Sequence, residues 1–80
     1  MTYYKTLITH MKYDIEYSFE DIIDIFREYH IFKSKYSVDV DSKRMYIIDA
    51  LKKAIEKEEV HKMEQPGIST KFVGHFYKRI

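Results

Sequence analysis

The chain has 80 residues, with 14 lysines and arginines against 13 aspartates and glutamates, so its net charge is +1 with neutral histidines. It has no cysteine, which excludes a disulfide framework and a thiolate metal site. No apolar run approaches the roughly 20 residues of a membrane span, and 45% hydrophobic residues are enough to form a core. We therefore expect one folded domain over residues 1–80. The absence of a secretion signal favours a cytoplasmic location.

The first seventeen residues admit two interpretations. Residues 3–13 place apolar side chains at helical spacing, at Tyr4, Leu7, Ile8 and Met11. Residues 11–17 instead alternate apolar and charged side chains, as a half-buried strand does. Whether residues 3–13 form a helix or a strand stays open, and a helix running into a short strand satisfies both patterns.

A helix is predicted over residues 19–31. Ser18 is a favourable N-cap, and the acidic Glu20 and Asp21 suit the positive end of the helix dipole. Asp21 takes the position of the Glu or Gln of a capping box, which it matches only approximately. The buried stripe is expected to contain Phe19, Ile22, Ile23 and Phe26, with Tyr29 or His30.

Residues 36–40 alternate again and predict a short strand or an extended connection. Asp41 or Ser42 then caps a long helix that is expected to reach about Glu58. Its buried face is predicted to consist of Ile47, Ile48, Leu51, Ala54 and Ile55. The opposite face is predicted to carry Tyr46, Asp49, Lys53, Glu56 and Lys57.

The last twenty residues predict a β-hairpin. Residues 60–64 and 71–80 are the expected strands. Gln65-Pro66-Gly67 is predicted to form a turn, and the tip is expected to have about five residues, 66–70. Phe72, Phe76 and Ile80 share one parity with Gly74, and we expect the two phenylalanines to face the core. The other parity carries Lys71, Val73, His75, Tyr77 and Arg79. The predicted fold class is α+β, with two or three helices and a C-terminal β-hairpin.

Charge is distributed unevenly along the chain. Residues 1–30 hold three basic and six acidic residues, a net charge of −3, whereas residues 31–80 hold eleven and seven, a net charge of +4. A basic face is the electrostatic footprint of a nucleic-acid-binding protein, although a solvated surface produces the same imbalance. The prediction requires the later cations to gather on one outward surface.

The order of a capped helix followed by a hairpin with a Pro-Gly tip resembles the second half of a winged-helix DNA-binding domain. The resemblance implies a small winged-helix-like fold, in which the helix enters the major groove and the hairpin is a wing that touches the DNA backbone or minor groove. It assigns DNA contacts to Ser42, Lys43, Tyr46 and Lys53 on the helix, and to Lys62, Lys71 and His75 on the wing. Asp49 departs from this pattern, since it would repel phosphates.

Aromatic residues interleave with basic ones at the end of the chain, in Phe76-Tyr77-Lys78-Arg79. Aromatic rings can stack on unpaired bases, so Tyr77 and Arg79 are further candidates for nucleic-acid contact. Tyrosine and arginine are also enriched where proteins bind proteins. The phenylalanines are expected to fill the core.

Metal binding and catalysis are not indicated. With a five-residue tip, His61 and His75 would lie opposite each other, but two imidazoles are short of the four ligands of a structural zinc site. No Gly-rich phosphate loop, nucleophile elbow or HExxH motif occurs. We therefore expect no cofactor, no metal and no enzyme activity.

Two functions stay in consideration. The first is a nucleic-acid-binding protein on duplex or single-stranded DNA, for example a regulator or replication accessory. The abundance of Ile, Lys and Tyr resembles translated AT-rich DNA and suggests a phage or mobile element. The alternative is a protein-binding inhibitor or small accessory subunit of a larger complex. A homodimer is compatible with either, and no membrane association is expected.

Overall fold

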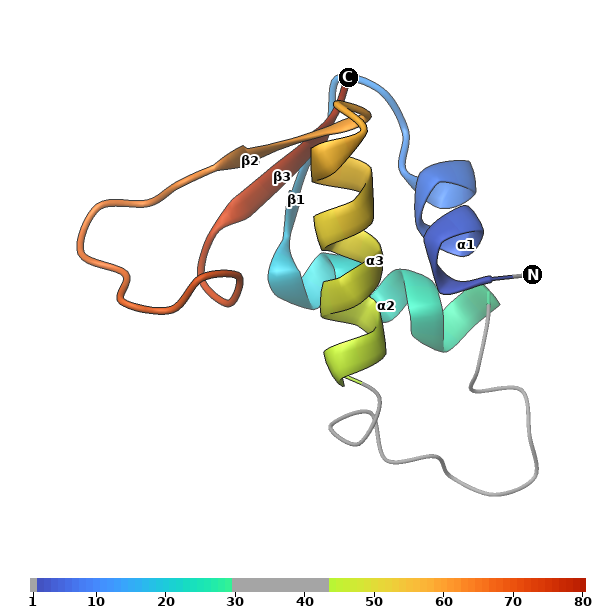
Figure 1. The fold of residues 1–80 in the computed structure, drawn as a ribbon, viewed down its shortest axis with the longest axis horizontal. Helices are drawn as coiled ribbons and strands as arrows, with labels where there is room; N and C mark the ends of the chain where they lie inside the picture. The colour runs from blue at the N-terminus through green and yellow to red at the C-terminus, as the bar shows by residue number, and fades with distance from the viewer. Residues whose placement is uncertain (1, 30–43) are drawn as a thin grey trace.

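The computed structural model describes residues 2–29 and 44–80, which form three helices and three strands (Figure 1). In chain order these are α1 (Tyr3–His10), β1 (Glu16–Ser18), α2 (Phe19–Tyr29), α3 (Arg44–Glu56), β2 (Val60–Met63) and β3 (Phe76–Arg79). The predicted α+β class is confirmed. The expected extended segment 36–40 and the candidate residues Ser42 and Lys43 lie outside the described residues.

The strands form one antiparallel sheet in the order β1-β3-β2. Tyr77 at the centre of β3 lies opposite Tyr17 of β1 and Lys62 of β2. Val60 and Tyr77 are buried, whereas their neighbours His61 and Phe76 are exposed. One face of the sheet therefore packs on the helices, and the other faces solvent.

The core lies where the three helices meet this sheet. Helix α1 packs against α2 and α3, while α2 also contacts β1 and α3 contacts β2. The fully buried large side chains are Leu7, Phe19, Ile22, Ile23, Phe26, Ile47, Leu51, Val60 and Tyr77. Within the described residues, none of the helices has the length and apolar character needed to cross a bilayer.

The opening of the chain is helical. Thr2 caps α1, since its hydroxyl accepts a hydrogen bond from the Lys5 N–H at 3.1 Å. The interpretation of a helix running into a short strand is confirmed, although the strand covers Glu16–Ser18 rather than all of residues 11–17. Asp14 adopts a left-handed conformation (φ 62°), which Asp tolerates and which interrupts an extended segment. Tyr13, 62% exposed, consequently points away from the core.

The prediction for α2 is confirmed over its described part. The Ser18 hydroxyl accepts a hydrogen bond from the Asp21 N–H at 3.1 Å, and the Asp21 carboxylate accepts one from the Ser18 N–H at 3.0 Å. Asp21 therefore closes a reciprocal capping box despite its shorter side chain. The stripe is buried as expected at Phe19, Ile22, Ile23 and Phe26, whereas Tyr29 is 46% exposed and His30 lies outside the described residues.

Helix α3 also follows its predicted pattern. Ile47, Leu51 and Ala54 are buried, together with Ala50, and Ile48 and Ile55 pack against the core cluster. The helix ends at Glu56, two residues before the predicted end. Glu58 then takes a left-handed conformation (φ 59°), which turns the chain into β2.

The hairpin prediction is correct in position but wrong in its details. Met63 pairs with Phe76, so the connection spans residues 64–75, twelve residues rather than five. We call this segment the β2–β3 loop, and in Figure 1 it projects away from the three helices. The core-facing residue of β3 is Tyr77, whereas Phe76 and Ile80 are exposed on the opposite parity. The expected core role of Phe76 is therefore wrong.

Candidate nucleic-acid interface

Two tight turns shape the β2–β3 loop. In the first, the Ile68 N–H donates to the Gln65 carbonyl across Pro66-Gly67, and Gly67 has φ 81° as position i+2 of a type II turn requires. In the second, the His75 N–H donates to the Phe72 carbonyl, and Gly74 has φ 92°. The loop therefore has a defined shape although it forms no strand.

His75 is the last residue of the loop, and its side chain is buried between other loop residues, with 4% exposed. Its Nδ1 accepts a hydrogen bond from the Gln65 N–H at 2.9 Å, and its Nε2 lies 2.7 Å from the Thr70 carbonyl oxygen. The imidazole thus joins the beginning and the middle of the loop to its end. The expectation that His75 contacts DNA is wrong, because the ring is buried within the protein.

Tyr77 connects the loop to the core. Its hydroxyl donates a hydrogen bond to the Phe72 carbonyl at 2.7 Å, and burial raises the pKa of this phenol well above its ordinary value. The Thr70 hydroxyl similarly donates to the Val73 carbonyl. Tyr77 is 0% exposed, so the prediction that it contacts nucleic acid is wrong.

The Phe72 ring lies between two lysines from different elements. The Lys62 ammonium is 5.1 Å and the Lys52 ammonium 5.9 Å from the ring centroid, within the range of cation–π attraction. Lys62 also donates to the Lys71 carbonyl at 2.8 Å and forms an ion pair with Glu64 at 3.4 Å. Lys71 itself is exposed beside Phe72.

These residues border a groove between α3 and the β2–β3 loop. A cavity of about 340 Å³ lies there, lined by Lys52, Ile55, Glu56, Lys62 and Phe72. We call the set Lys52, Lys62, Lys71 and Phe72 the basic groove. It presents two ammonium groups at one aromatic ring, with the exposed Lys71 next to Phe72 in the chain and with Glu56 and Glu64 at its margins. Such a surface can hold phosphates at its cations and place an apolar contact beneath them.

Lys53 and Tyr46 lie elsewhere, on the side of α3 that faces α1. The ammonium groups of Lys53 and Lys57 lie 4.7 and 4.9 Å from the Tyr4 ring centroid, and Tyr46 stacks on Tyr3. The Tyr4 hydroxyl donates a hydrogen bond to the Glu59 carboxylate, which raises the pKa of this phenol, with a smaller contribution from desolvation. The predicted cations therefore do not all share one surface.

Arg79 has a structural role. Its guanidinium donates to the Glu59 carbonyl at 2.8 Å, lies 3.8 Å from the Glu59 carboxylate, and covers the Tyr13 ring at 5.1 Å. The side chain is largely buried, with 12% exposed. These contacts fasten the end of β3 and the segment before β1 to Glu59, so the guanidinium is already engaged within the protein.

The expected opposition of His61 and His75 is wrong. His61 pairs with Lys78 in the sheet, whereas His75 is in the loop. In the part of the chain that the structure describes, no three His, Asp or Glu side chains come close enough to hold a metal ion. The error follows from the loop length, since seven additional loop residues change every pairing that a five-residue tip implies.

Sequence reasoning missed Lys52. It lies four residues after Ile48 and three before Ile55, both of which pack against the core. That spacing puts Lys52 at the border of the buried stripe, next to β2, which α3 contacts. Lys53 is a further 100° around the helix. The same spacing rule could have separated the two lysines.

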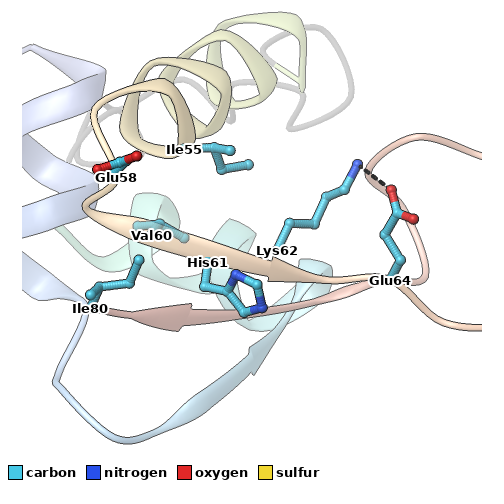
Figure 2. A pocket seen from close by; sticks show the side chains of 7 residues that line it. All are labelled: Ile55, Glu58, Val60, His61, Lys62, Glu64 and Ile80. Carbon is cyan, nitrogen blue, oxygen red and sulfur yellow. Dashed lines mark ion pairs between the residues drawn. The ribbon is translucent and has the colours of Figure 1, made fainter.

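A second cavity, of about 560 Å³, lies along the outer edge of β2 (Figure 2). Ile55 from α3 lies above the strand in this view, and Ile80 from the end of β3 lies below it. Glu58 and Glu64 stand at its two ends, and the dashed line marks the ion pair between Lys62 and Glu64. It follows the open edge of β2, the outer strand of the sheet.

Comparison with protein-family models, with curated proteins and with solved structures finds no match for this chain. What the basic groove and the β2 edge can bind is therefore inferred from their geometry and charge.

Proposed function

We propose that this chain is a small nucleic-acid-binding protein of the winged-helix type, such as a regulator or a replication accessory, and that the basic groove is its contact surface. The observation that carries the proposal is the convergence of the Lys52 and Lys62 ammonium groups, from a helix and a strand, on the Phe72 ring of the projecting loop, where the exposed Lys71 precedes Phe72. Helix α3 is followed directly by the β2–β3 hairpin, and α1 packs against α2 and α3, which supports the winged-helix assignment.

The mechanism is phosphate contact from two sides of the groove. The exposed Lys52 on α3 and Lys71 on the β2–β3 loop supply phosphate contacts, and Lys62, whose ammonium lies 2.8 Å from the Lys71 carbonyl, supplies a third. Neutralising phosphates releases condensed counterions, so affinity falls with salt. Three such contacts give a slope of log K against log salt of about −2.7 on duplex DNA and about −2.1 on a single strand.

The test is a salt-dependent anisotropy titration with a random-sequence duplex and a random single strand. In the variant Lys52→Ala, Lys62→Ala, Lys71→Ala, we expect affinity to fall and the salt slope to approach zero, because the phosphate contacts are lost. The matched control is Lys5→Ala, Lys12→Ala, Lys57→Ala, which removes the same charge from other parts of the surface.

Circular dichroism establishes that both variants fold. If the two triple variants lose affinity equally, net charge rather than the basic groove governs binding. If the wild-type chain binds neither nucleic acid, the proposed function is wrong.

The alternative is a protein-binding module, and the open edge of β2 favours it. The Ile80 N–H donates to the Glu59 carbonyl at 2.9 Å, so Glu59 and Ile80 form a hydrogen-bonded pair. In an antiparallel ladder such pairs alternate with pairs that are not hydrogen-bonded. The backbone groups of Val60 and Lys62 then point away from β3, toward the cavity in Figure 2. An extended segment of another protein can pair with such an edge.

This alternative is tested by affinity capture from the source cell with the wild-type chain and with Ile80→Lys. Ile80 is 61% exposed at the margin of the cavity, so the substitution changes the edge without disturbing the core. A protein retained by the wild type and lost with Ile80→Lys supports the module. Retention of DNA without any protein excludes it.

A further inference from the structure

The two contacts of His75 fix its protonation state. A carbonyl oxygen only accepts hydrogen bonds, so the Nε2 that lies 2.7 Å from the Thr70 oxygen must carry a proton. A backbone N–H only donates, so the Nδ1 that receives the Gln65 N–H at 2.9 Å must be without one. The folded loop therefore requires the neutral imidazole in its Nε2–H tautomer.

This one ring joins the first half of the loop to its last residue. Tyr77 and Thr70 hold the carbonyls of Phe72 and Val73, in the second half of the loop. In the first half, the ring of His75 bonds Gln65 and Thr70, and the Ile68 side chain lies against Gly74. Lys71 and Phe72 follow immediately after Thr70, so the ring contributes to their position together with Lys62 and Tyr77, which hold the carbonyls of these two residues.

We infer that His75 is a positioning residue and an acid-sensitive lock, whose neutral imidazole holds the β2–β3 loop in the shape that presents the basic groove. The consequence for binding rests on the proposed function, whereas the lock itself is a property of the fold. Protonation at Nδ1 would place two donors, the ring N–H and the Gln65 N–H, against each other. It would also place a charge on a ring that is 4% exposed.

The charged groups around the ring do not offset this cost. Glu20, in the first turn of α2, lines a cavity of about 280 Å³ together with His75, but it is exposed. Glu64 in the loop is already paired with Lys62 of β2. The positive charges of Lys62 and Lys71 would repel a further positive charge on the His75 ring. Among the described residues no carboxylate is hydrogen-bonded to the His75 ring, whose partners are two backbone groups.

Acid is expected to weaken binding to nucleic acid, which is the opposite of what added positive charge alone would do. Exposed histidines gain positive charge as the pH falls below about 6.5, which normally strengthens binding to phosphates. Release of the loop would instead weaken binding, because Lys71 and Phe72 lose their fixed position beside Lys52. Acid weakening is therefore the signature of the lock.

The decisive experiment is NMR on the wild-type chain, so no variant has to fold. At pH 8 we expect the ring nitrogens of His75 to show the Nε2–H tautomer and the Gln65 amide to be protected from hydrogen exchange. Between pH 8 and 5 we expect that protection to be lost in step with protonation of His75, while the Leu51 amide in α3 stays protected. A charged or Nδ1–H ring at pH 8, or a protection of the Gln65 amide that does not change with pH, overturns the lock.

Binding at low salt supplies the second readout. From pH 7.5 to 5.5 we expect the wild-type chain to lose affinity for a random duplex by roughly fivefold to tenfold, the factor that one lost hydrogen-bonded contact accounts for. His75→Gln should remove this dependence, and His61→Gln, at an exposed histidine of β2, should retain it. If the chain binds no nucleic acid at pH 7.5, the proposed function fails and the NMR titration still decides the lock.

Discussion

The helical core and the β2–β3 loop are held together by different interactions. In the core, the contacts between α1, α2 and α3 are made by apolar side chains such as Phe26 and Leu51, which are fully buried. In the loop, the specific contacts are hydrogen bonds from a few polar side chains, with His75 and Tyr77 the most buried among them. Apolar burial is non-directional and shared among many neighbours, whereas each hydrogen bond depends on one donor and one acceptor.

The difference implies that the two regions fail in different ways. Loss of one apolar group leaves a cavity that weakens the whole core. Loss of one loop hydrogen bond opens a local segment, and regions with few apolar contacts open at lower free energy than the core. The surface that we propose for nucleic acids is thus built partly on the less stable region.

The largest effect is expected for Leu51→Ala. Leu51 is fully buried on α3, and truncation in such a position costs about 3 kcal/mol of unfolding free energy through lost burial and a residual cavity. Urea unfolding followed by circular dichroism measures the change. Its neighbour Lys52→Ala is the control and should shift stability by about 0.5 kcal/mol or less. Equal effects from the two would mean that α3 is not packed as described.

The core was also the region that the sequence pattern predicted well. The i, i+3, i+4 spacing identified the buried faces of α2 and α3, and Ser18 with Asp21 marked the start of α2. These features depend on residues close in sequence, and helical periodicity converts their spacing directly into a face.

The loop and β3 could not be predicted in the same way. Hydrophobicity favoured Phe76 for the core, but Tyr77 is buried there because its hydroxyl reaches the Phe72 carbonyl. His75 looked like a surface residue because its partners are backbone groups, which a sequence pattern does not mark. Of the predicted cations, the Lys62 ammonium meets the Lys71 carbonyl, a contact that depends on the loop's path, whereas Lys53 lies over Tyr4 on the side of α3 that faces α1.

Tyr77 joins the two regions, and Tyr77→Phe is expected to have an intermediate effect. The variant keeps the buried ring but leaves the Phe72 carbonyl without its donor, at a cost of about 1–2 kcal/mol. Urea unfolding at pH 7 measures this loss. A change comparable to that of Leu51→Ala would show that the hydroxyl supports the core as well as the loop.

The Tyr77 phenol also makes the stability of the wild-type chain depend on pH, and Tyr77→Phe should remove this dependence. Burial raises the pKa of the Tyr77 phenol, so above about pH 10 the unfolded chain loses this proton while the folded chain keeps it. The folded state then binds more protons, and its stability falls as the pH rises above 10, by up to about 1.4 kcal/mol per pH unit from this group. Below pH 10 the contribution is constant. Unfolding curves between pH 9 and 11.5 should be less steep in pH for Tyr77→Phe, and an unchanged slope would contradict the assigned burial.

The smallest and most local effect is expected from the two loop glycines. Gly67 and Gly74 both have positive φ, at 81° and 92°, where an alanine is strained by about 1 kcal/mol. A Cβ at Gly67 would meet open space, whereas one at Gly74 would lie 3.0 Å from the Ile68 Cγ2. Gly74→Ala should therefore cost more than Gly67→Ala, because Ile68 has to move.

Amide hydrogen exchange distinguishes a local from a global loss. If the loop opens on its own, both glycine variants should accelerate exchange at Gln65 by roughly fivefold, with Gly74→Ala the larger, while exchange at Leu51 changes little. If exchange at Leu51 accelerates equally, the loop and the core unfold as one cooperative unit. In that case a change at the ring of His75 would be transmitted to α3 itself, and both sides of the basic groove would depend on the same hydrogen bonds.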